Sequence, residues 1–252
     1  MSEKQFCLVG AALVVALWLM GGHKAAPTQN HYLKVYIRES GMFITFEGPE
    51  GSGKTSQIVL LAEFLQERGF EVVQTREPGG TRIGDQIRAV LHDVGNGEIT
   101  AVTELLLFAA SRAQLVRQVI QPALAAGKIV LCDRYADSTL AYQGYGRGLD
   151  LTLLQTLIQI ATGGLQPDLT FLLDIDVERG LSRRQSAGNE MNRLDLEAVS
   201  FHQQVRRGYH TLAANDPQRW VIVDADRQVT AVQQELRTII QSRMAWPPDW
   251  SV

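Results

Sequence analysis

The chain has 252 residues, 45% of them apolar and 20% charged, which is enough for one sizeable globular domain with a buried core. Its net charge of −3 and pI of about 6.0 lack the basic footprint of proteins that bind duplex nucleic acid, so no nucleic-acid partner is expected. The two cysteines, Cys7 and Cys132, give neither a disulfide framework nor a cysteine-based zinc site, and the five histidines show no ligand spacing.

Residues 1–41 differ in composition from the rest of the chain. The run 6–22, FCLVGAALVVALWLMGG, is apolar throughout, but it is shorter than the roughly 20 residues that a membrane-spanning helix needs. Three interpretations stay open: a domain whose true start is Met42, a membrane anchor, or a cleaved targeting segment. We therefore divide the chain into an apolar extension, 1–41, and one domain, 42–252. A cytoplasmic location is expected, with membrane contact only through residues 6–22.

The first predicted element after the extension is a strand, Phe43–Glu47, which leads into a glycine-rich loop and then a helix, Thr55–Arg68. The loop matches the phosphate-binding pattern G-x-x-x-x-G-K-[ST] completely. Its backbone N–H groups and the positive end of the helix dipole favour a nucleoside triphosphate, ATP. The residues expected to bind it are Gly48, Glu50, Gly51, Ser52, Gly53, Lys54 and Thr55.

Two loop side chains have specific expected roles. Lys54 is predicted to reach the β- and γ-phosphates from a solvent-facing loop, and the Thr55 hydroxyl is predicted to bind Mg²⁺.

The next two predicted strands, Glu71–Gln74 and Lys128–Asp133, each end near a charged group. After the first comes Arg76, which opens a rigid turn, REPGGT. At the end of the second, IVLCD delivers Asp133 toward a metal, and Arg134 beside it suits a phosphate. A surface ion pair worth roughly 0 to 1 kcal/mol is the alternative interpretation of these two residues.

A long predicted helix, Thr103–Ala126, carries Phe108 and Arg112 four residues apart, hence on one face. An aromatic ring and a guanidinium placed together suit a nucleobase, although the apolar run around Phe108 is also typical of core. Farther along, Thr139, Tyr142 and Gln143 share a helical face and offer a hydroxyl, a phenol and an amide to a base and a sugar.

The remaining predicted elements continue the alternation of strands and helices. The strands are Leu169–Ile175 and Trp220–Asp224, and the helices are Leu151–Thr162, Leu196–Ala214 and Thr230–Met244. This order is typical of an α/β fold with a parallel sheet covered by helices on both faces. Ligands of such sheets bind at the carboxyl ends of the strands.

In this order and at these separations, the motifs FEGPEGSGKT, TREPGGT, LLFAASR, DRYADSTLAYQGYGRG and PDLTFLLDI resemble bacterial thymidylate kinases from Met42 to about Met244. The resemblance implies a P-loop NTPase fold with a five-stranded parallel sheet and a mobile lid. It also implies transfer of the γ-phosphoryl group of ATP to dTMP, giving dTDP and ADP. A homodimer is the assembly that the resemblance suggests.

The resemblance assigns roles at the acceptor site, residue by residue. Arg76 and Arg134 would hold the 5′-phosphate of dTMP, with Arg88 beside it, and Glu50 would face the 3′-hydroxyl region. Phe108 would stack on thymine and Arg112 would bond its O4. Thr139 and Gln143 would complete base recognition, and Tyr142 would stand where a ribose 2′-hydroxyl clashes. The catalytic residues would be Lys54, Asp133, Arg134 and Arg193.

Arg193 enters through a departure from part of the family. One subclass carries an arginine in the phosphate loop, where this chain has Gly51, so a lid should supply the cation that stabilises the migrating phosphoryl group. The polar stretch 182–193 is predicted to be this lid and not to pack against the domain. Arg193 is the first candidate in it, and Arg183 and Arg184 are alternatives that also fit solvated helix charges.

Two other functional classes share the phosphate loop. A deoxynucleoside kinase acting on thymidine would not need two arginines converging on an acceptor phosphate. A GTP-binding switch would need an Asn-Lys-x-Asp segment to recognise guanine, and the sequence contains none. Acceptor choice distinguishes these classes.

Overall fold

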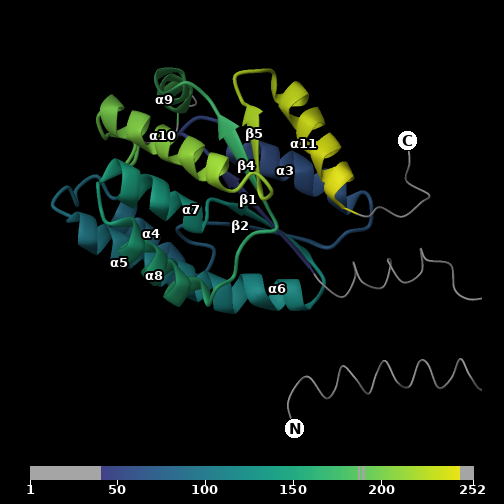
Figure 1. Ribbon diagram of the computed structural model, residues 1–252, viewed down its shortest axis with the longest axis horizontal. Coiled ribbons are helices and arrows are strands. Elements are labelled where there is room, and N and C mark those ends of the chain that lie inside the picture. Colours follow the sequence, from purple (N-terminus) through teal and green to yellow (C-terminus); the bar gives the residue numbers. More distant parts are fainter. Residues whose placement is uncertain (1–40, 187, 189–190, 245–252) are drawn as a thin grey trace, which may run out of the picture. The chain divides into compact units, whose positions relative to one another are not determined.

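The computed structural model describes residues 41–186, 188 and 191–244 (Figure 1). The apolar run 6–22, and with it the interpretations of residues 1–40, lies outside the described residues. Within the described ranges, no helix is both long and apolar enough to cross a membrane.

The described residues form one five-stranded parallel sheet with the strand order β2-β3-β1-β4-β5, which confirms the predicted fold class. The strands are β1 (Met42–Glu47), β2 (Val72–Arg76), β3 (Ile129–Asp133), β4 (Leu169–Asp174) and β5 (Trp220–Asp224). The strand β2 ends later than predicted, because Thr75 and Arg76 continue the ladder opposite Cys132 and Asp133. Arg76 is therefore the last strand residue, in register with Asp133, and not the first residue of a turn.

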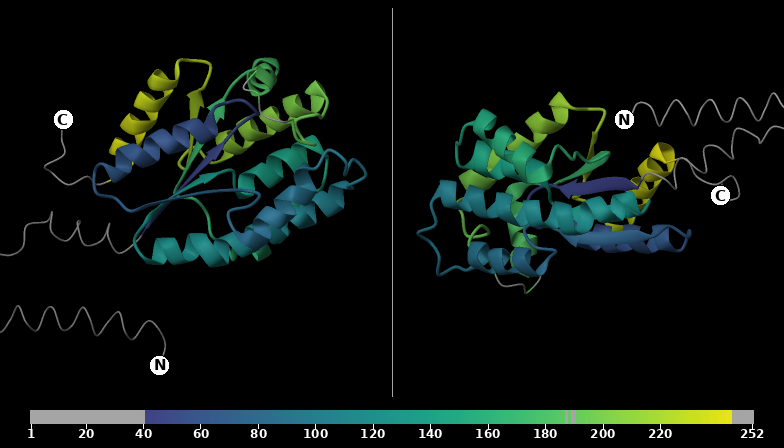
Figure 2. Two further views of the ribbon diagram at one scale, coloured as in Figure 1. Left: turned by 180° about the vertical axis from the view of Figure 1, so that it is seen from behind. Right: turned by 90° about the horizontal axis from the view of Figure 1, so that it is seen from below.

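Helices cover both faces of the sheet (Figures 1 and 2). Their bounds are α3 (Lys54–Gln66), α4 (Arg82–His92), α5 (Ala101–Leu115), α6 (Gln121–Ala125), α7 (Ala136–Thr139), α8 (Leu151–Thr162), α9 (Val177–Ser186), α10 (Val199–Asn215) and α11 (Val229–Arg243), and two π-helical segments are η1 (Val116–Ile120) and η2 (Leu140–Gly146).

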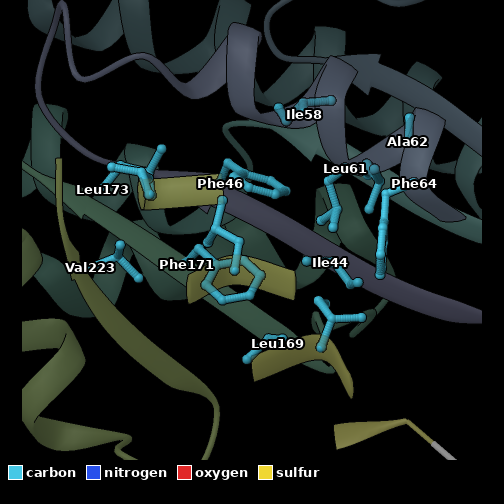
Figure 3. Packing of buried hydrophobic residues seen from close by; sticks show 14 of the residues in the cluster. Ile44, Phe46, Ile58, Leu61, Ala62, Phe64, Leu169, Phe171, Leu173 and Val223 are labelled. Carbon is cyan, nitrogen blue, oxygen red and sulfur yellow. The ribbon is translucent and has the colours of Figure 1, made fainter. Parts of the chain in front are cut away.

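Side chains alternate between the two faces along each strand, and this alternation divides the core. On one face, Ile44 and Phe46 of β1 pack with Leu61 of α3 (Figure 3). Leu236 of α11 belongs to the same buried cluster. On the other face, Phe43 packs under the α5-η1-α6 run, and Leu172 of β4 packs under η2 and α10. Each fully buried side chain of this size contributes roughly 1.5 to 3 kcal/mol, so burial on both faces fixes the sheet and its loops.

Three helical regions differ from the predictions. The long helix begins at Ala101 because the Thr100 hydroxyl accepts the Thr103 N–H at 3.3 Å, and it passes through the π-helical η1 before α6. The helix α4 was not predicted, although Thr81 caps it by accepting the Gly84 N–H at 2.9 Å. The helix α9 includes residues 182–186, so the start of the predicted lid is helical and not a free loop.

Candidate active site

A cavity of about 1060 Å³ opens at the carboxyl edge of the sheet. The phosphate loop, the β2–α4 turn, α5, the β3–α7 connection, η2 and the end of α9 all contribute to its wall. Most of the predicted site residues line it: Glu50, Gly51, Gly53, Lys54, Thr55, Arg76, Arg88, Phe108, Arg112, Asp133, Arg134, Thr139, Tyr142 and Gln143. Gly48, Ser52 and Arg193 are not among the lining residues.

The phosphate loop is held in shape by glycines that no other residue replaces. Gly48 and Gly51 have φ values of 136° and 69°. A Cβ atom on Gly51 would lie 1.9 Å from the carbonyl oxygen of Gly180 in α9. Since this carbonyl fills the space, an arginine cannot stand at residue 51 here, and any further cation over the donor phosphates, besides Lys54, must come from another segment.

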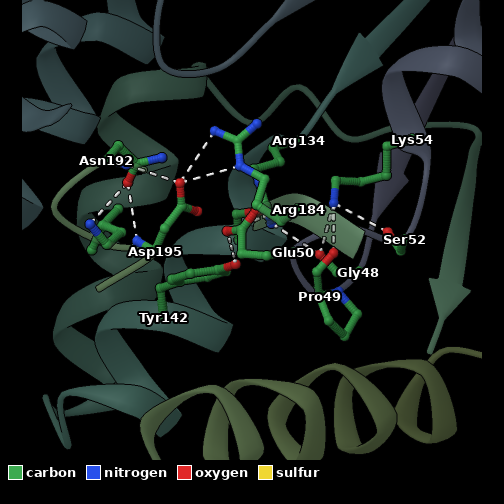
Figure 4. A network of polar contacts seen from close by, with 12 residues as sticks. Gly48, Pro49, Glu50, Ser52, Lys54, Arg134, Tyr142, Arg184, Asn192 and Asp195 are labelled. Carbon is green, nitrogen blue, oxygen red and sulfur yellow. Dashed lines mark hydrogen bonds and ion pairs between the residues drawn. The ribbon is translucent and has the colours of Figure 1, made fainter. Parts of the chain in front are cut away.

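Lys54 is not exposed on the loop as the sequence predicted. It is only 7% exposed, because its ammonium group turns inward and donates to the carbonyl oxygens of Gly48 at 3.0 Å and Pro49 at 2.9 Å (Figure 4). It also donates to the Ser52 hydroxyl at 3.2 Å. Burial and the neighbouring Arg134 lower the pKa of Lys54 to about 8. The ammonium group therefore lies inside the loop, at the position where its carbonyl groups converge.

Thr55 and Asp133 lie side by side, as a shared metal site requires. The Thr55 hydroxyl donates to Oδ2 of Asp133 at 2.7 Å, although the two residues are 78 positions apart in the chain. A hydroxyl and a carboxylate are the oxygen ligands that Mg²⁺ takes at a triphosphate, with water and phosphate oxygens completing its shell. The donor set therefore fits Mg²⁺.

Three arginines of the cavity wall lie near one another: Arg76, Arg88 and Arg134. Arg76 is more than half exposed, and its one ion pair among the described residues is a long 3.5 Å contact with Asp85. Arg88 donates to the carbonyl oxygen of Pro78 at 3.0 Å, and burial together with the nearby Arg76 lowers its pKa. Arg134 completes the group. Cations that crowd one another in a cavity wall favour an anion between them, since the anion offsets their repulsion.

Arg134 is the most tightly held of the three. Its backbone has a φ of 68°, and its guanidinium donates to Gly48 O, to the Tyr209 hydroxyl and to Oε1 of Glu50. Tyr142 also donates its hydroxyl to Oε1 of Glu50 at 2.8 Å (Figure 4). Burial alone would raise the pKa of Glu50, but Arg134, Lys54 and the Tyr142 hydroxyl together lower it to about 2. Glu50 is therefore an anion that links the phosphate loop to the arginine site.

Phe108 and Arg112 line the cavity from the same face of α5. Phe108 is half-buried, and it is absent from all three clusters of buried apolar side chains in the described part of the chain. Arg112 is only 1% exposed. It donates to Glu77 at 2.8 Å and to the Thr139 hydroxyl at 2.9 Å, so much of its hydrogen-bonding capacity is already used inside the protein.

Thr139, Tyr142 and Gln143 come together where α7 passes into the π-helical η2. Gln143 is only 1% exposed and donates its amide N–H to Glu104 at 2.8 Å, which fixes the orientation of the amide. The wider turn of a π-helix recurs at functional sites, where it changes which side chains face a ligand.

Comparison with known protein families matches residues 46–236 to thymidylate kinase. A thymidylate kinase of Roseiflexus castenholzii is 50% identical over 219 residues, which are 82% of this chain and 96% of that protein. A thymidylate kinase of Geotalea uraniireducens is 51% identical over 210 residues, 81% of this chain and 99% of that protein. The chain belongs to the thymidylate kinase family.

A solved thymidylate kinase from Ehrlichia chaffeensis supports the same assignment through its structure. It is 35% identical in sequence, has a TM-score of 0.67, and the match covers 80% of this chain and all of that chain. The thymidylate kinase fold thus extends over the described sheet and its helices. Membership of this family implies ATP as a substrate.

The structure places Arg193, the first candidate for the lid cation, outside the residues that line the cavity. Arg193 is 8% exposed, and its guanidinium donates to Glu104 at 2.5 Å and to the Leu91 carbonyl oxygen at 3.1 Å. The buried carboxylate holds it away from the cavity. The two alternatives, Arg183 and Arg184, both line the cavity. Arg183 forms an ion pair with Asp226, and Arg184 forms one with Asp195.

Three buried carboxylates at the site escaped the sequence analysis: Glu47, Glu77 and Glu104. Glu77 forms an ion pair with Arg112. Glu104 forms ion pairs with Arg147 and Arg193 and accepts a hydrogen bond from the amide of Gln143. The available signal was an acidic residue inside or at the end of an apolar run, as in ITFEG and TELLLF. An ionised group there is rarely buried unless it is paired.

Proposed function

We propose that this protein transfers the γ-phosphoryl group of ATP to dTMP and releases dTDP and ADP. One observation carries the proposal. A phosphate loop with its lysine and a cluster of three arginines with an aromatic ring line the same cavity. A triphosphate at one end and a nucleoside monophosphate at the other would meet with their phosphates between them. Membership of the thymidylate kinase family implies ATP and dTMP as these two nucleotides.

At the donor end, the loop N–H groups would bind the β-phosphate and Lys54 would reach the β- and γ-phosphates. Its ammonium group exchanges the carbonyl oxygens of Gly48 and Pro49 for phosphate oxygens in this step. Thr55 and Asp133 would hold Mg²⁺. The ion, when bound, neutralises charge on the phosphates.

At the acceptor end, Arg76 and Arg134 would bind the 5′-phosphate, with Arg88 beside them. Charge-assisted hydrogen bonds of this kind contribute roughly 1.5 to 3 kcal/mol each. Glu50, held by Arg134 and Tyr142, would face the 3′-hydroxyl region of the sugar.

The base would lie against Phe108, with Arg112 at O4 and Thr139 and Gln143 along its edge. Tyr142 would occupy the space that a 2′-hydroxyl needs. Little covalent chemistry is required of the protein, because phosphoryl transfer depends on placing two substrates in line and neutralising the migrating charge. Arg183 and Arg184 are our candidates for the neutralising cation.

The direct test is a coupled ADP-release assay with ATP and a panel of acceptors: dTMP, dUMP, dCMP, dGMP and thymidine. We expect dTMP to give the highest kcat/KM and thymidine to give no turnover above background. Turnover with thymidine and none with dTMP would replace the proposal with a deoxynucleoside kinase, in which the three arginines would have no phosphate to bind.

Three further parts of the proposal concern the whole chain. We propose that residues 42–252 are the catalytic domain, that the enzyme works in the cytoplasm and that it forms a homodimer. Exposed apolar side chains on α5 and α8, including Leu106, Leu153 and Ile160, support a protein-protein contact there. Sedimentation of the chain tests the dimer, and a Leu106→Glu variant should sediment as a monomer. Full activity in a fragment 42–252 would support the proposed catalytic domain.

A further inference from the structure

Three oxygen atoms, two of them on fully buried residues and one on Ser138 of the cavity wall, form a triangle near Arg134. The Ser138 hydroxyl lies 2.6 Å and the Tyr209 hydroxyl 2.8 Å from Oε2 of Glu47, and the two hydroxyls lie 2.8 Å from each other. Glu47 and Tyr209 have no exposed surface. The three residues come from the end of β1, from α7 and from α10, so the triangle ties three elements together at one point.

This triangle holds Arg134 from two sides. The Tyr209 hydroxyl accepts a hydrogen bond from Nη1 of Arg134 at 3.0 Å, which fixes the guanidinium. Oε1 of Glu47 accepts the backbone N–H of Tyr135 at 2.8 Å, which fixes the peptide directly after Arg134. Arg134 is the one non-glycine residue with positive φ among the described residues. A side chain seldom takes this conformation unless its surroundings impose it.

The contacts leave Arg134 with two donors for a ligand. Nη1 donates to Gly48 O and Tyr209, and Nη2 donates once to Glu50. Nε–H and one N–H of Nη2 have no hydrogen-bond partner in the part of the chain that the structure describes. Two such donors on one guanidinium match two oxygens of a phosphate group.

We infer that Glu47, Ser138 and Tyr209 are a positioning triad that sets the Arg134 guanidinium for the acceptor phosphate. None of the three needs to touch the phosphate. The inference rests on the proposed function, because it takes Arg134 as a ligand of the dTMP 5′-phosphate. It adds that the affinity for the acceptor depends on a buried carboxylate at the end of β1 and a tyrosine on α10.

The test is Tyr209→Phe, which keeps the ring packed near Trp220 and Tyr142 and removes only the hydroxyl. We expect KM for dTMP to rise about tenfold, the effect of losing one hydrogen bond to a charged group, with KM for ATP within twofold of its original value. The matched control is Thr45→Val, which removes a buried hydroxyl bond to Thr170 from β1 without a contact to Arg134. It should shift neither KM value.

A double-mutant cycle separates positioning from general stability. In an Arg134→Ala background, Tyr209→Phe should add almost nothing to the rise in KM for dTMP, because the group that it positions is gone. An equal further rise in that background, or equal rises for ATP and dTMP in the single variant, would overturn the inference. If Arg134→Ala itself leaves KM for dTMP unchanged, the acceptor assignment in the proposed function fails too.

Glu47 supplies a second, independent variant pair. Glu47→Ala should raise KM for dTMP in the same selective way. Glu47→Gln should recover most of that loss, since its amide oxygen can accept the Tyr135 N–H and its amide N–H groups can donate to both hydroxyls. Equal KM values for dTMP in the two variants would contradict the triad, and circular dichroism spectra check that both variants are folded.

Discussion

The two ends of the cavity are built in different ways. The donor end takes all its residues but Asp133 from one short stretch, 48–55, and its shape depends on glycines and backbone groups. The acceptor end takes single side chains from the β2–α4 region, α5, the β3–α7 connection and η2, and its shape depends on buried ion pairs. A contiguous motif carries its own geometry, whereas a composite site exists only after the sheet and helices have packed.

The ends also differ in how their cations are satisfied. Lys54 donates hydrogen bonds to carbonyl groups of its own loop, so the cation of the donor end is satisfied by that loop. Arg76 and Arg88 lie close enough to repel each other, and within the described residues each has one opposing contact: Arg76 with Asp85 at 3.5 Å and Arg88 with the Pro78 carbonyl oxygen at 3.0 Å. Substitutions at the two ends should therefore change different kinetic constants.

The largest effect is expected at the donor end. Lys54→Ala should lower kcat by on the order of 10³-fold or more, because the charge on the migrating phosphoryl group loses its cation. Steady-state assays at saturating dTMP measure this. Lys128→Ala is the control, since it removes a lysine that pairs with exposed Glu71 far from the loop. A Lys54→Ala enzyme with near-normal turnover would show that the loop does not bind the donor as proposed.

The acceptor end should respond through affinity instead. Arg76→Ala and Arg134→Ala should each raise KM for dTMP by about 10- to 100-fold and change KM for ATP much less, since one charge-assisted phosphate bond contributes roughly 1.5 to 3 kcal/mol. Arg117→Ala, on an exposed position of η1, is the charge-matched control. Equal losses for both substrates would mean that the two ends are not separate.

Glu47 lies beneath the junction of the two ends and should make stability depend on pH. Burial and Asp137 raise the pKa of Glu47 to about 7, although Arg134 and the Tyr209 hydroxyl oppose the shift, and Lys54 also lies within electrostatic reach. A raised pKa stabilises the folded state at low pH, and this stability is lost as the pH rises through about 7.

The expected loss between pH 5 and pH 8 is about 2 kcal/mol for this carboxyl group. Urea denaturation of the original protein and of Glu47→Gln at both pH values measures it. Between pH 5 and pH 8, the unfolding free energy of the original protein should fall by this amount relative to that of Glu47→Gln. Parallel pH profiles would show that Glu47 does not titrate in this range.

The smallest effect concerns the sugar. If Tyr142 stands against the second carbon of the sugar, Tyr142→Ala should narrow the ratio of kcat/KM between dTMP and its ribose analogue by about tenfold. Phe108→Ala should weaken both acceptors together, because stacking on the base does not depend on the sugar. An unchanged ratio in Tyr142→Ala would leave that residue as packing around Glu50.

The sequence by itself determined the local parts of this protein. The loop 48–55 and the strands that end at Asp133 and Asp174 were predictable, because continuous apolar runs and a contiguous glycine pattern encode them directly. The family resemblance was confirmed as well. The roles of the acceptor residues stay predictions, since their presence in one cavity gives their positions and not the ligand atoms that they bind.

Only the tertiary structure decided which partners the charged side chains of the site take. Lys54 turned inward, Arg193 turned to Glu104, and Arg134 was fixed by Glu47 and Tyr209. These pairings join residues up to 162 positions apart in the chain, so neither periodicity nor a motif reports them. The physical reason is that a buried charge takes the partner that packing brings within hydrogen-bond reach, and packing is a property of the whole fold.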